Sequence, residues 1–119
     1  MITIELPWPD KRLSPNSRCH WREKAEAADE AHRAGYLSTL ATEDLPYVLD
    51  GLSYAASYEF CPPDRRRRDQ DNYLGMMKNY VDGVFHYLRS DDSRIKRTVL
   101  EWGEVVKGGK VVLTLEEME

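Results

Sequence analysis

The feature that most constrains the fold is a helical segment between two segments that look like strands. Residues 72–88 carry an apolar stripe at helical spacing, formed by Tyr73, Met77, Tyr80, Val81, Val84 and Leu88. Residues 52–61 on one side carry aromatic and small apolar residues, and residues 94–106 on the other side partly alternate apolar and polar residues, so both predict strands. Parallel strands need a crossover connection of about a dozen residues or more, usually a helix. The sequence therefore predicts some parallel pairing.

The rest of the chain adds further predicted strands and helices to this pattern. Residues 2–6 alternate apolar and polar side chains, which predicts a strand. The proline-free residues 18–41 predict a long helix, which Gly35 is expected to divide or weaken. Residues 42–51 predict a loop punctuated by Pro46. The sequence KGGK at 107–110 predicts a hairpin that pairs 94–106 with 111–115.

The predicted element order is therefore β-α-β-α-β-β within a single domain, residues 1–119. Two helices and a mixed sheet around one core correspond to the α+β fold class. The length of 119 residues is that of one domain with a modest core.

Composition favours a cytoplasmic protein. No apolar run approaches the roughly 18–20 residues of a membrane span, and the first residues show no basic region followed by an apolar core. Cys19 and Cys61 lack a paired motif and are expected to be free thiols. The three histidines lack metal-ligand spacing with each other or with cysteine, so no zinc site is expected; they are His20, His32 and His86.

One basic segment stands out in an acidic chain. The net charge is −4, and the isoelectric point of about 5.4 argues against a globally basic nucleic-acid binder. Residues 64–71, however, contain four arginines and three aspartates and carry a local charge of +1. This pattern predicts an external anion, with phosphate gripped by the consecutive Arg65, Arg66, Arg67 and Arg68.

Asp69 and Asp71 follow the arginines directly. In an extended segment their Cα atoms would lie about 6.5 Å apart with the side chains on one side. Two such carboxylates can converge on Mg²⁺, which combines carboxylates with water and phosphate oxygens. The alternative is a surface pair in salt bridges with the arginines. Asp92 in the Asp91-Asp92 turn could supply a third carboxylate, or both residues could merely cap a turn.

Lys78 and Asn72 each have two interpretations. Lys78 lies seven residues after Asp71, which on a continuous helix returns it to the same face within about 20°. It could then contact a phosphate or orient the attacking water, or it could form an i,i+4 ion pair with Asp82. Asn72 could cap the helix, or bind a phosphate or base.

These residues together resemble the RusA family of Holliday junction resolvases. The resemblance lies in RRRRDQDN, then a lysine, an aspartate on the same helix and a DD turn. The opening ITIELPWP and the late Gly-Gly turn also fit, so the resemblance spans nearly the whole chain. It implies a small homodimeric α+β enzyme, often phage- or prophage-encoded, that uses Mg²⁺, with Mn²⁺ as an alternative ion, to nick four-way DNA junctions symmetrically.

The resemblance assigns roles residue by residue. Asp69, Asp71 and Asp92 match the family's catalytic, metal-binding carboxylates. The family lysine sits four residues after the second of these, where this chain has Gly75; Lys78 takes that role only with a three-residue insertion. The segment SPNSRCHW differs from the family's Asn-rich loop. Its His20 and Trp21 would be a structural histidine and a buried tryptophan, or DNA contacts.

The sequence raises three candidate functions. The leading hypothesis is an Mg²⁺-dependent, structure-selective endonuclease, and a C₂ dimer would match the approximate two-fold symmetry of a four-way junction. The alternative is a protein that binds branched DNA without efficient cleavage. A phosphate- or nucleotide-binding regulatory domain lacks a glycine-rich loop ahead of a helix, because Gly108-Gly109 is expected in a hairpin.

Overall fold

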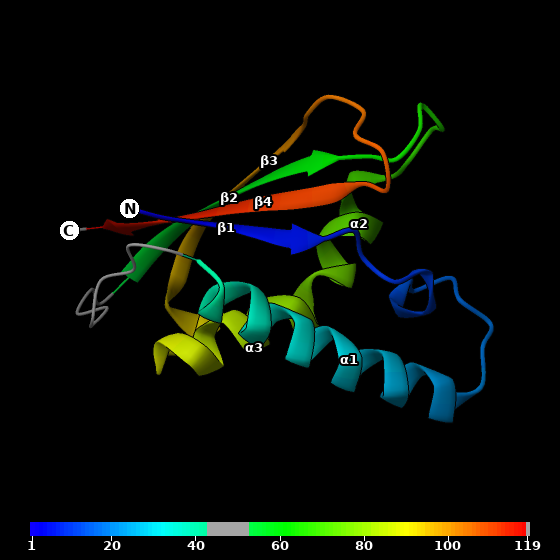
Figure 1. Ribbon diagram of the computed structural model, residues 1–119, viewed down its shortest axis with the longest axis horizontal. Helices are drawn as coiled ribbons and strands as arrows, with labels where there is room; N and C mark the ends of the chain where they lie inside the picture. Colours follow the sequence, from blue (N-terminus) through cyan, green and yellow to red (C-terminus); the bar gives the residue numbers. More distant parts are fainter. Residues whose placement is uncertain (43–52, 119) are drawn as a thin grey trace.

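A four-stranded mixed sheet forms the framework of the computed structural model, which describes residues 1–42 and 53–118 (Figure 1). The strands are β1 (Ile2–Pro7), β2 (Ser53–Cys61), β3 (Ile95–Trp102) and β4 (Lys110–Met118), in the spatial order β1-β4-β2-β3. β4 is antiparallel to β1 and to β2, whereas β2 and β3 are parallel. The predicted parallel pairing across the helical segment is confirmed.

Three helices accompany the sheet. α1 (Trp21–Leu40) and α3 (Lys78–Leu88) lie along one of its faces, and α2 (Gln70–Met76) precedes α3 (Figure 1). The short 3₁₀ turns η1 (Lys11–Leu13) and η2 (Asp92–Arg94) stand before α1 and β3. The single-domain α+β class is confirmed. The prediction of one helix over 72–88 was wrong, because the ladder tightens at Met77, whose N–H donates to the Leu74 carbonyl at 3.1 Å.

The core lies between the sheet and the helices. β1 alternates strictly between buried and exposed side chains, with Ile2, Ile4 and Leu6 buried. The same face of the sheet carries buried side chains from β2 and β4, which are Tyr54, Tyr58, Phe60, Val111, Leu113 and Leu115. α3 covers them with Val84 and Phe85. The period-two pattern of the strands thus sets which face the helices bury.

The predicted hairpin between β3 and β4 was wrong. A turn does form there, with positive φ at Gly108 (80°) and Gly109 (72°), but the two strands lie on opposite sides of β2. The chain crosses the end of β2, where Gly103 N–H donates to the Phe60 carbonyl at 2.8 Å. The reason is burial: β4 alternates with fully buried residues and suits a central position, whereas β3 is mostly exposed and suits an edge.

Two glycines bring α1 and α3 into backbone contact. A Cβ added to Gly35 would lie 1.9 Å from the Tyr80 carbonyl oxygen, and one added to Gly83 would lie 2.0 Å from the His32 carbonyl oxygen. Gly35 therefore does not divide α1, as the sequence had suggested. The helix is continuous there because this glycine is buried at the crossing.

Three further predictions concern the chain as a whole. Cys19 and Cys61 are free, as predicted. In the part of the chain that the structure describes, no helix has the length and apolarity that crossing a membrane would require. The predicted loop at 42–51, with Pro46, lies outside the described residues except for Thr42.

Replacing Gly83 with alanine tests the helix crossing. The added methyl group would meet backbone atoms that cannot rotate away, so Gly83→Ala is expected to lower the free energy of unfolding by about 3 kcal/mol. Gly75→Ala is the matched control, because a Cβ at Gly75 in α2 has no neighbour within 4 Å. That change should stabilise by about 0.5–1 kcal/mol. Urea denaturation measures both, and equal stabilities would contradict the close crossing.

Candidate functional site

Arg68 anchors the arginine-rich segment to the body of the protein. Its side chain is only 6% exposed, and its Nη2 lies 2.7 Å from Asp64 Oδ1. Its Nη1 donates to the carbonyls of Asp64 and Arg66, both at 2.9 Å. Arg68 is therefore the internal tether of the segment, and this conformation does not support the prediction that it binds DNA.

Four aromatic rings pack together next to this guanidinium. They are Trp8 after β1, Phe60 of β2, Tyr73 of α2 and Trp102 of β3. Trp8 and Tyr73 lie 5.2 Å apart between ring centroids, and Phe60 and Trp102 lie 5.5 Å apart. The Arg68 guanidinium stands 5.4 Å from the Trp8 centroid and 5.9 Å from that of Tyr73. A cation over desolvated aromatic faces is held electrostatically as well as by packing.

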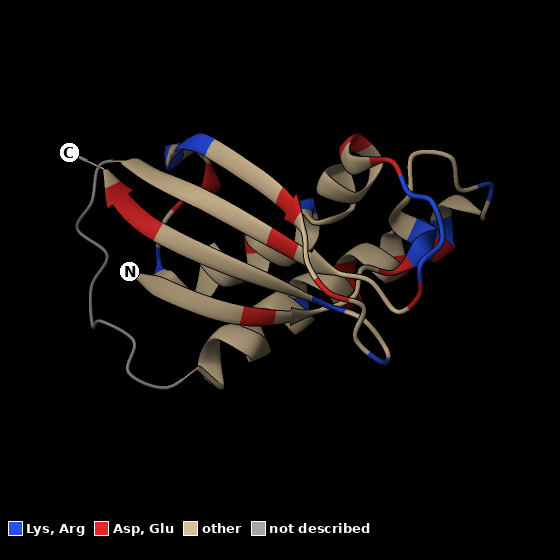
Figure 2. Cartoon of the chain, turned by 90° about the horizontal axis from the view of Figure 1, so that it is seen from above, with Lys and Arg blue, Asp and Glu red and all other residues tan. Residues whose placement is uncertain are grey.

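The other three arginines reach solvent. Arg65, Arg66 and Arg67 are exposed, and Figure 2 shows the run as a blue stretch of loop with red at both ends. Arg66 makes a peripheral contact with Asp64, at 3.3 Å with 78% of its side chain exposed. In the described part of the chain, neither Arg65 nor Arg67 forms an ion pair. These side chains are available to an external anion.

Asp64 is a residue whose role the sequence did not reveal. Its pKa is lowered to about 2 because its carboxylate accepts a hydrogen bond from the Arg66 backbone N–H and others from the Arg68 and Arg66 side chains. It stays ionised at neutral pH and holds Arg66 and Arg68 of the arginine run. A signal was present, since an aspartate two residues before a turn residue often accepts its N–H.

Asp69 and Asp71 are exposed at the start of α2. Asp69 caps this helix, accepting the N–H of Asp71 at 2.9 Å and that of Asn72 at 3.3 Å. Neither aspartate forms an ion pair within the described residues, so the alternative of salt bridges to the arginines is wrong. Asn72 does not cap the helix, because Asp69 does. Its predicted contact with DNA stays a prediction.

Lys78 and Asp92 are two predicted site residues that the fold brings together. Lys78 Nζ contacts Asp92 Oδ2, and it lies 2.9 Å from Asp82 Oδ1. The expected i,i+4 pair therefore exists alongside a second, long-range one. The continuous helix from which a shared face of Lys78 and Asp71 was expected is absent, because α2 ends at Met76 and α3 begins at Lys78. The shared face stays a prediction.

The charge of Lys78 is fixed by these two carboxylates. Asp92 first, and then Asp82, raise its pKa above the ordinary lysine value. It therefore remains an ammonium at neutral pH and acts as a cation or a proton donor, not as a base. Tyr58 of β2 lies close by, and burial together with the negative charge of Asp92 raises its pKa to about 12.

Asp91 and Asp92 have separate roles. Asp91 caps η2, accepting the Ser93 N–H at 2.9 Å, and its pKa is lowered by this bond and by a hydrogen bond with Asp92. The turn-capping interpretation is therefore confirmed for Asp91. Asp92 instead turns toward Lys78. The assignment of the second aspartate to the site is compatible with this arrangement.

The three carboxylates do not form a ready metal centre. Within residues 1–42 and 53–118, no three or more His, Cys, Asp or Glu side chains are grouped so that they could hold an ion. Asp92 is engaged by Lys78, and Asp69 accepts two backbone N–H groups. In this conformation Asp69, Asp71 and Asp92 do not fit a centre made by the chain alone, and their shared metal ion stays a prediction.

A shallow hollow lies beside the exposed arginines. Arg65 and Arg66 line one part of it, and Trp102 and Val105 line another. Trp102 is 37% exposed and Val105 is 46% exposed, so apolar surface faces solvent next to positive charge. The sequence did not indicate these two residues, because they lie more than thirty positions from the arginines.

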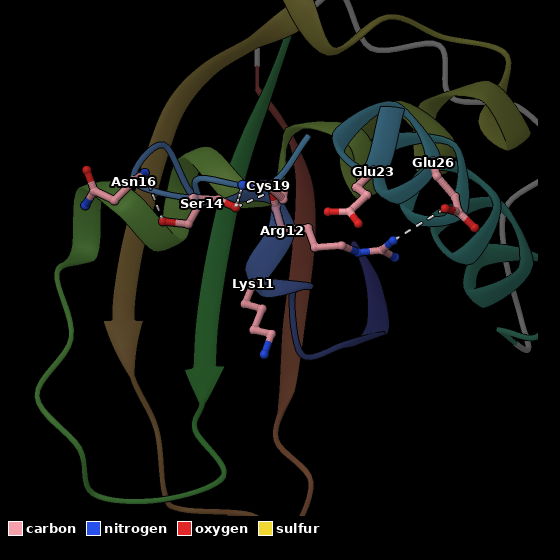
Figure 3. A pocket seen from close by; sticks show the side chains of 8 residues that line it. Lys11, Arg12, Ser14, Asn16, Cys19, Glu23 and Glu26 are labelled. Atoms are coloured by element: carbon pink, nitrogen blue, oxygen red, sulfur yellow. Dashed lines mark hydrogen bonds and ion pairs between the residues drawn. The ribbon is translucent and has the colours of Figure 1, made fainter. Parts of the chain in front are cut away.

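A second hollow lies between the segment after β1 and the first turns of α1 (Figure 3). Arg12 points toward Glu26, with Nη1 at 3.7 Å from Oε2, and it also pairs with Asp10 at 2.8 Å and Glu30 at 2.7 Å. The pKa of Asp10 is lowered chiefly by its side-chain hydrogen bond with Arg12. These pairs hold η1 against α1 and so position the SPNSRCHW segment.

His20 and Trp21 end that segment. His20 caps α1, its Nδ1 accepting the Arg22 N–H at 3.1 Å, so the structural interpretation of His20 is confirmed. Trp21 is 67% exposed, and the expectation of a buried tryptophan was wrong. A contact between Trp21 and DNA stays a prediction.

Acid titration tests the anchor. The folded-state pKa of Asp64, about 2, is below its ordinary value of 3.8, so its ionised form contributes stability above about pH 4 that is lost as the pH falls toward 2. Removing the carboxylate removes this dependence. We expect the free energy of unfolding to fall less steeply between pH 4 and pH 2 in Asp64→Asn than in the wild type. Urea denaturation at each pH measures the slopes, and parallel slopes would contradict the role of Asp64.

No family model matches the chain. The chain is similar to an uncharacterized protein of Xylella fastidiosa, with 36% identity over 121 residues that cover 97% of this chain and 76% of the other. The similarity thus extends over both the sheet and the arginine-rich segment. The name of that protein states no activity.

Proposed function

We propose that this chain, which belongs to the same family as the uncharacterized Xylella fastidiosa protein, is an Mg²⁺-dependent endonuclease that cuts branched DNA. One observation carries the proposal: a tethered loop presents three exposed arginines and leads directly into two exposed carboxylates without ion-pair partners in the described chain. The RusA resemblance of the same residues supports a four-way junction as the substrate.

The arginines supply the affinity for the DNA backbone. Guanidinium groups bind phosphate oxygens in pairs of parallel hydrogen bonds. Arg65 and Arg67 have no ion pair to break, within the described residues, before they bind. Because Arg68 fixes the base of the loop, less conformational entropy is lost when the exposed side chains engage a phosphate. The acidic total charge does not oppose this local binding.

Asp69 and Asp71 would hold the cation together with the substrate. Mg²⁺ commonly takes one or two carboxylates, several waters and phosphate oxygens, so a DNA phosphate can complete a set that the chain alone does not form. When bound, such an ion supplies charge neutralisation and an activated water for phosphodiester hydrolysis. Mn²⁺ could substitute. The N-cap hydrogen bonds of Asp69 hold its carboxylate in one orientation.

Lys78 and Asp92 would act as a coupled pair. Lys78 is held as an ammonium between two carboxylates. In this role it neutralises charge that develops on the phosphate, and its movement toward DNA would release Asp92. Asp92 could then join Asp69 and Asp71, as the resemblance implies. The lysine thus keeps the third carboxylate neutralised until a phosphate competes for it.

The hollow beside the arginines suits branched DNA. Unpaired or splayed bases at a branch point stack on aromatic faces, whereas bases inside a duplex do not reach them. Trp102 offers partly exposed aromatic surface next to Arg65 and Arg66, which would take the neighbouring phosphates. A homodimer would present two such sites related by the two-fold axis of the junction. A DNA substrate of this kind would place the protein in the cytoplasm of a bacterial or phage-infected cell.

The second candidate is a branched-DNA-binding protein without efficient cleavage. Two observations favour it: the family lysine position holds Gly75, and Asp92 is tied to Lys78 so that the carboxylates are not assembled. The arginine-rich loop would then bind DNA without cleavage by the carboxylates. Binding without nicking separates this candidate from the nuclease.

Junction nicking tests the carboxylates. Wild-type protein with a synthetic four-way junction and Mg²⁺ is expected to give paired nicks opposite one another. Asp71→Asn should lower the nicking rate about 100-fold or more while junction binding survives, because one metal-binding carboxylate is removed and repulsion toward DNA falls. Lys78→Ala should also slow nicking. Asp29→Asn, an exposed change on α1, is the control and should match the wild type.

The outcomes of the nicking experiment separate the candidates. Junction binding without nicking at every Mg²⁺ concentration would establish the binding protein. Neither binding nor nicking by the wild type would reject both.

Salt dependence tests the arginines. Each phosphate contact that is lost should lower the slope of log affinity against log salt by about 1. Arg65→Ala combined with Arg67→Ala is therefore expected to weaken junction binding and to reduce that slope by about 2. Arg33→Ala removes an exposed arginine from α1 and should leave the slope unchanged. Fluorescence anisotropy across a salt series measures the slope. Equal slopes for the double variant and Arg33→Ala would show that DNA does not bind at Arg65 and Arg67.

A further inference from the structure

Two histidines that are far apart in the sequence meet at the crossing of α1 and α3. His32 Nε2 lies 3.0 Å from His86 Nδ1, although the residues are 54 positions apart. The ring centroids are 5.2 Å apart and the ring planes make an angle of 53°. His86 is exposed and His32 is half-buried, so solvent reaches the pair. Sequence spacing had given no reason to expect a site here.

The helix crossing holds both rings in place. The backbone of α3 at Gly83 touches the carbonyl of His32, and that of α1 at Gly35 touches the carbonyl of Tyr80. The backbone of His32 is thus part of the contact itself, and His86 follows Gly83 by three residues, about one helical turn. Tyr36 packs against the His86 ring at 5.1 Å. The two imidazoles are therefore pre-organised by the fold.

The separation of the two nitrogens matches the spacing of two ligands on one ion. Zinc–imidazole bonds are about 2.0–2.1 Å long. Two such bonds place their nitrogens about 2.9 Å apart at a right angle and about 3.3 Å apart at a tetrahedral angle. The observed 3.0 Å lies between these values. Small rotations of the rings would direct both lone pairs at a common point.

We propose that His32 and His86 form a binding site for a divalent transition-metal ion, such as Zn²⁺, Ni²⁺ or Cu²⁺, that links α1 to α3. The ion takes the place of the hydrogen that lies between His32 Nε2 and His86 Nδ1. Each neutral ring keeps one proton on the nitrogen that faces away, so binding requires a change of tautomer in the donor ring and no redox step. Water supplies the remaining ligands, because no third His, Cys, Asp or Glu in the described chain joins the pair.

This site is separate from the proposed nuclease centre and does not rest on it. Imidazole prefers Zn²⁺, Cu²⁺ and Ni²⁺, whereas carboxylates and phosphates prefer Mg²⁺. Mg²⁺ should therefore have no effect at the histidines. An ion that binds only when the two helices are packed together stabilises the folded state by an amount that grows with the logarithm of the ratio of free ion to dissociation constant.

The test is thermal unfolding of the untagged, chelator-stripped protein with ZnCl₂, NiCl₂ or MgCl₂. At free Zn²⁺ or Ni²⁺ about 100-fold above the dissociation constant, the melting temperature should rise by about 5 °C or more, whereas Mg²⁺ should give no such rise through this pair. Calorimetric titration should give one ion per chain. His32→Gln and His86→Gln should each weaken binding at least about tenfold.

His20→Asn is the matched control, since asparagine can still cap α1 and the variant also removes one histidine. It should bind like the wild type. Electron paramagnetic resonance of the Cu²⁺ complex gives a readout that does not depend on stability, and it should show two nitrogen ligands in the wild type and one in His86→Gln. Absence of binding by the wild type would overturn the proposal. Unchanged binding by both glutamine variants would also overturn it.

Discussion

The enclosure of the Arg68 guanidinium is the interaction on which the candidate site depends. Its Nη1 and Nη2 donate to two carbonyls and to Asp64, and its guanidinium carbon lies 5.4 Å and 5.9 Å from the ring centroids of Trp8 and Tyr73. A buried charge is costly unless it is paired and hydrogen-bonded. Here the pairing holds one arginine of the run against the protein and leaves the other three exposed to solvent. Asp69, at the start of α2, directly follows Arg68, so the contacts of Arg68 also position Asp69.

Local patterns in the sequence predicted most of the elements. Alternation gave β1, proline-free composition gave α1, and the helical stripe gave the crossover that makes β2 and β3 parallel. The misplacement of β4 has a physical cause: a glycine turn fixes how the chain bends, but pairing is decided by which strand can be buried on both edges. Likewise, the stripe at 72–88 does not reveal the break at Met77, because the spacing persists across one tightened turn.

The site was predictable in kind but not in its pairings. The adjacent arginines and aspartates predict phosphate and metal binding, and this chemistry stays a prediction. The partner of each charge depends on tertiary folding, which sets Arg68 on Asp64 rather than on Asp69, and Lys78 on Asp92 across fourteen residues. The histidine pair is the extreme case, since it exists only because two glycines allow the helices to touch.

The exposed β3 edge of the sheet affects how two copies of this protein could associate. β3 pairs on one side only, and its outer backbone groups could template a strand from another chain. It carries the exposed charges Lys96, Arg97 and Glu101 along its length. Charged side chains on a free edge resist such addition, because pairing with another strand would remove them from water. Self-association by continuing the sheet at β3 is thereby disfavoured, and a two-fold assembly would form through another surface, such as the β1 edge, the helices or the loops.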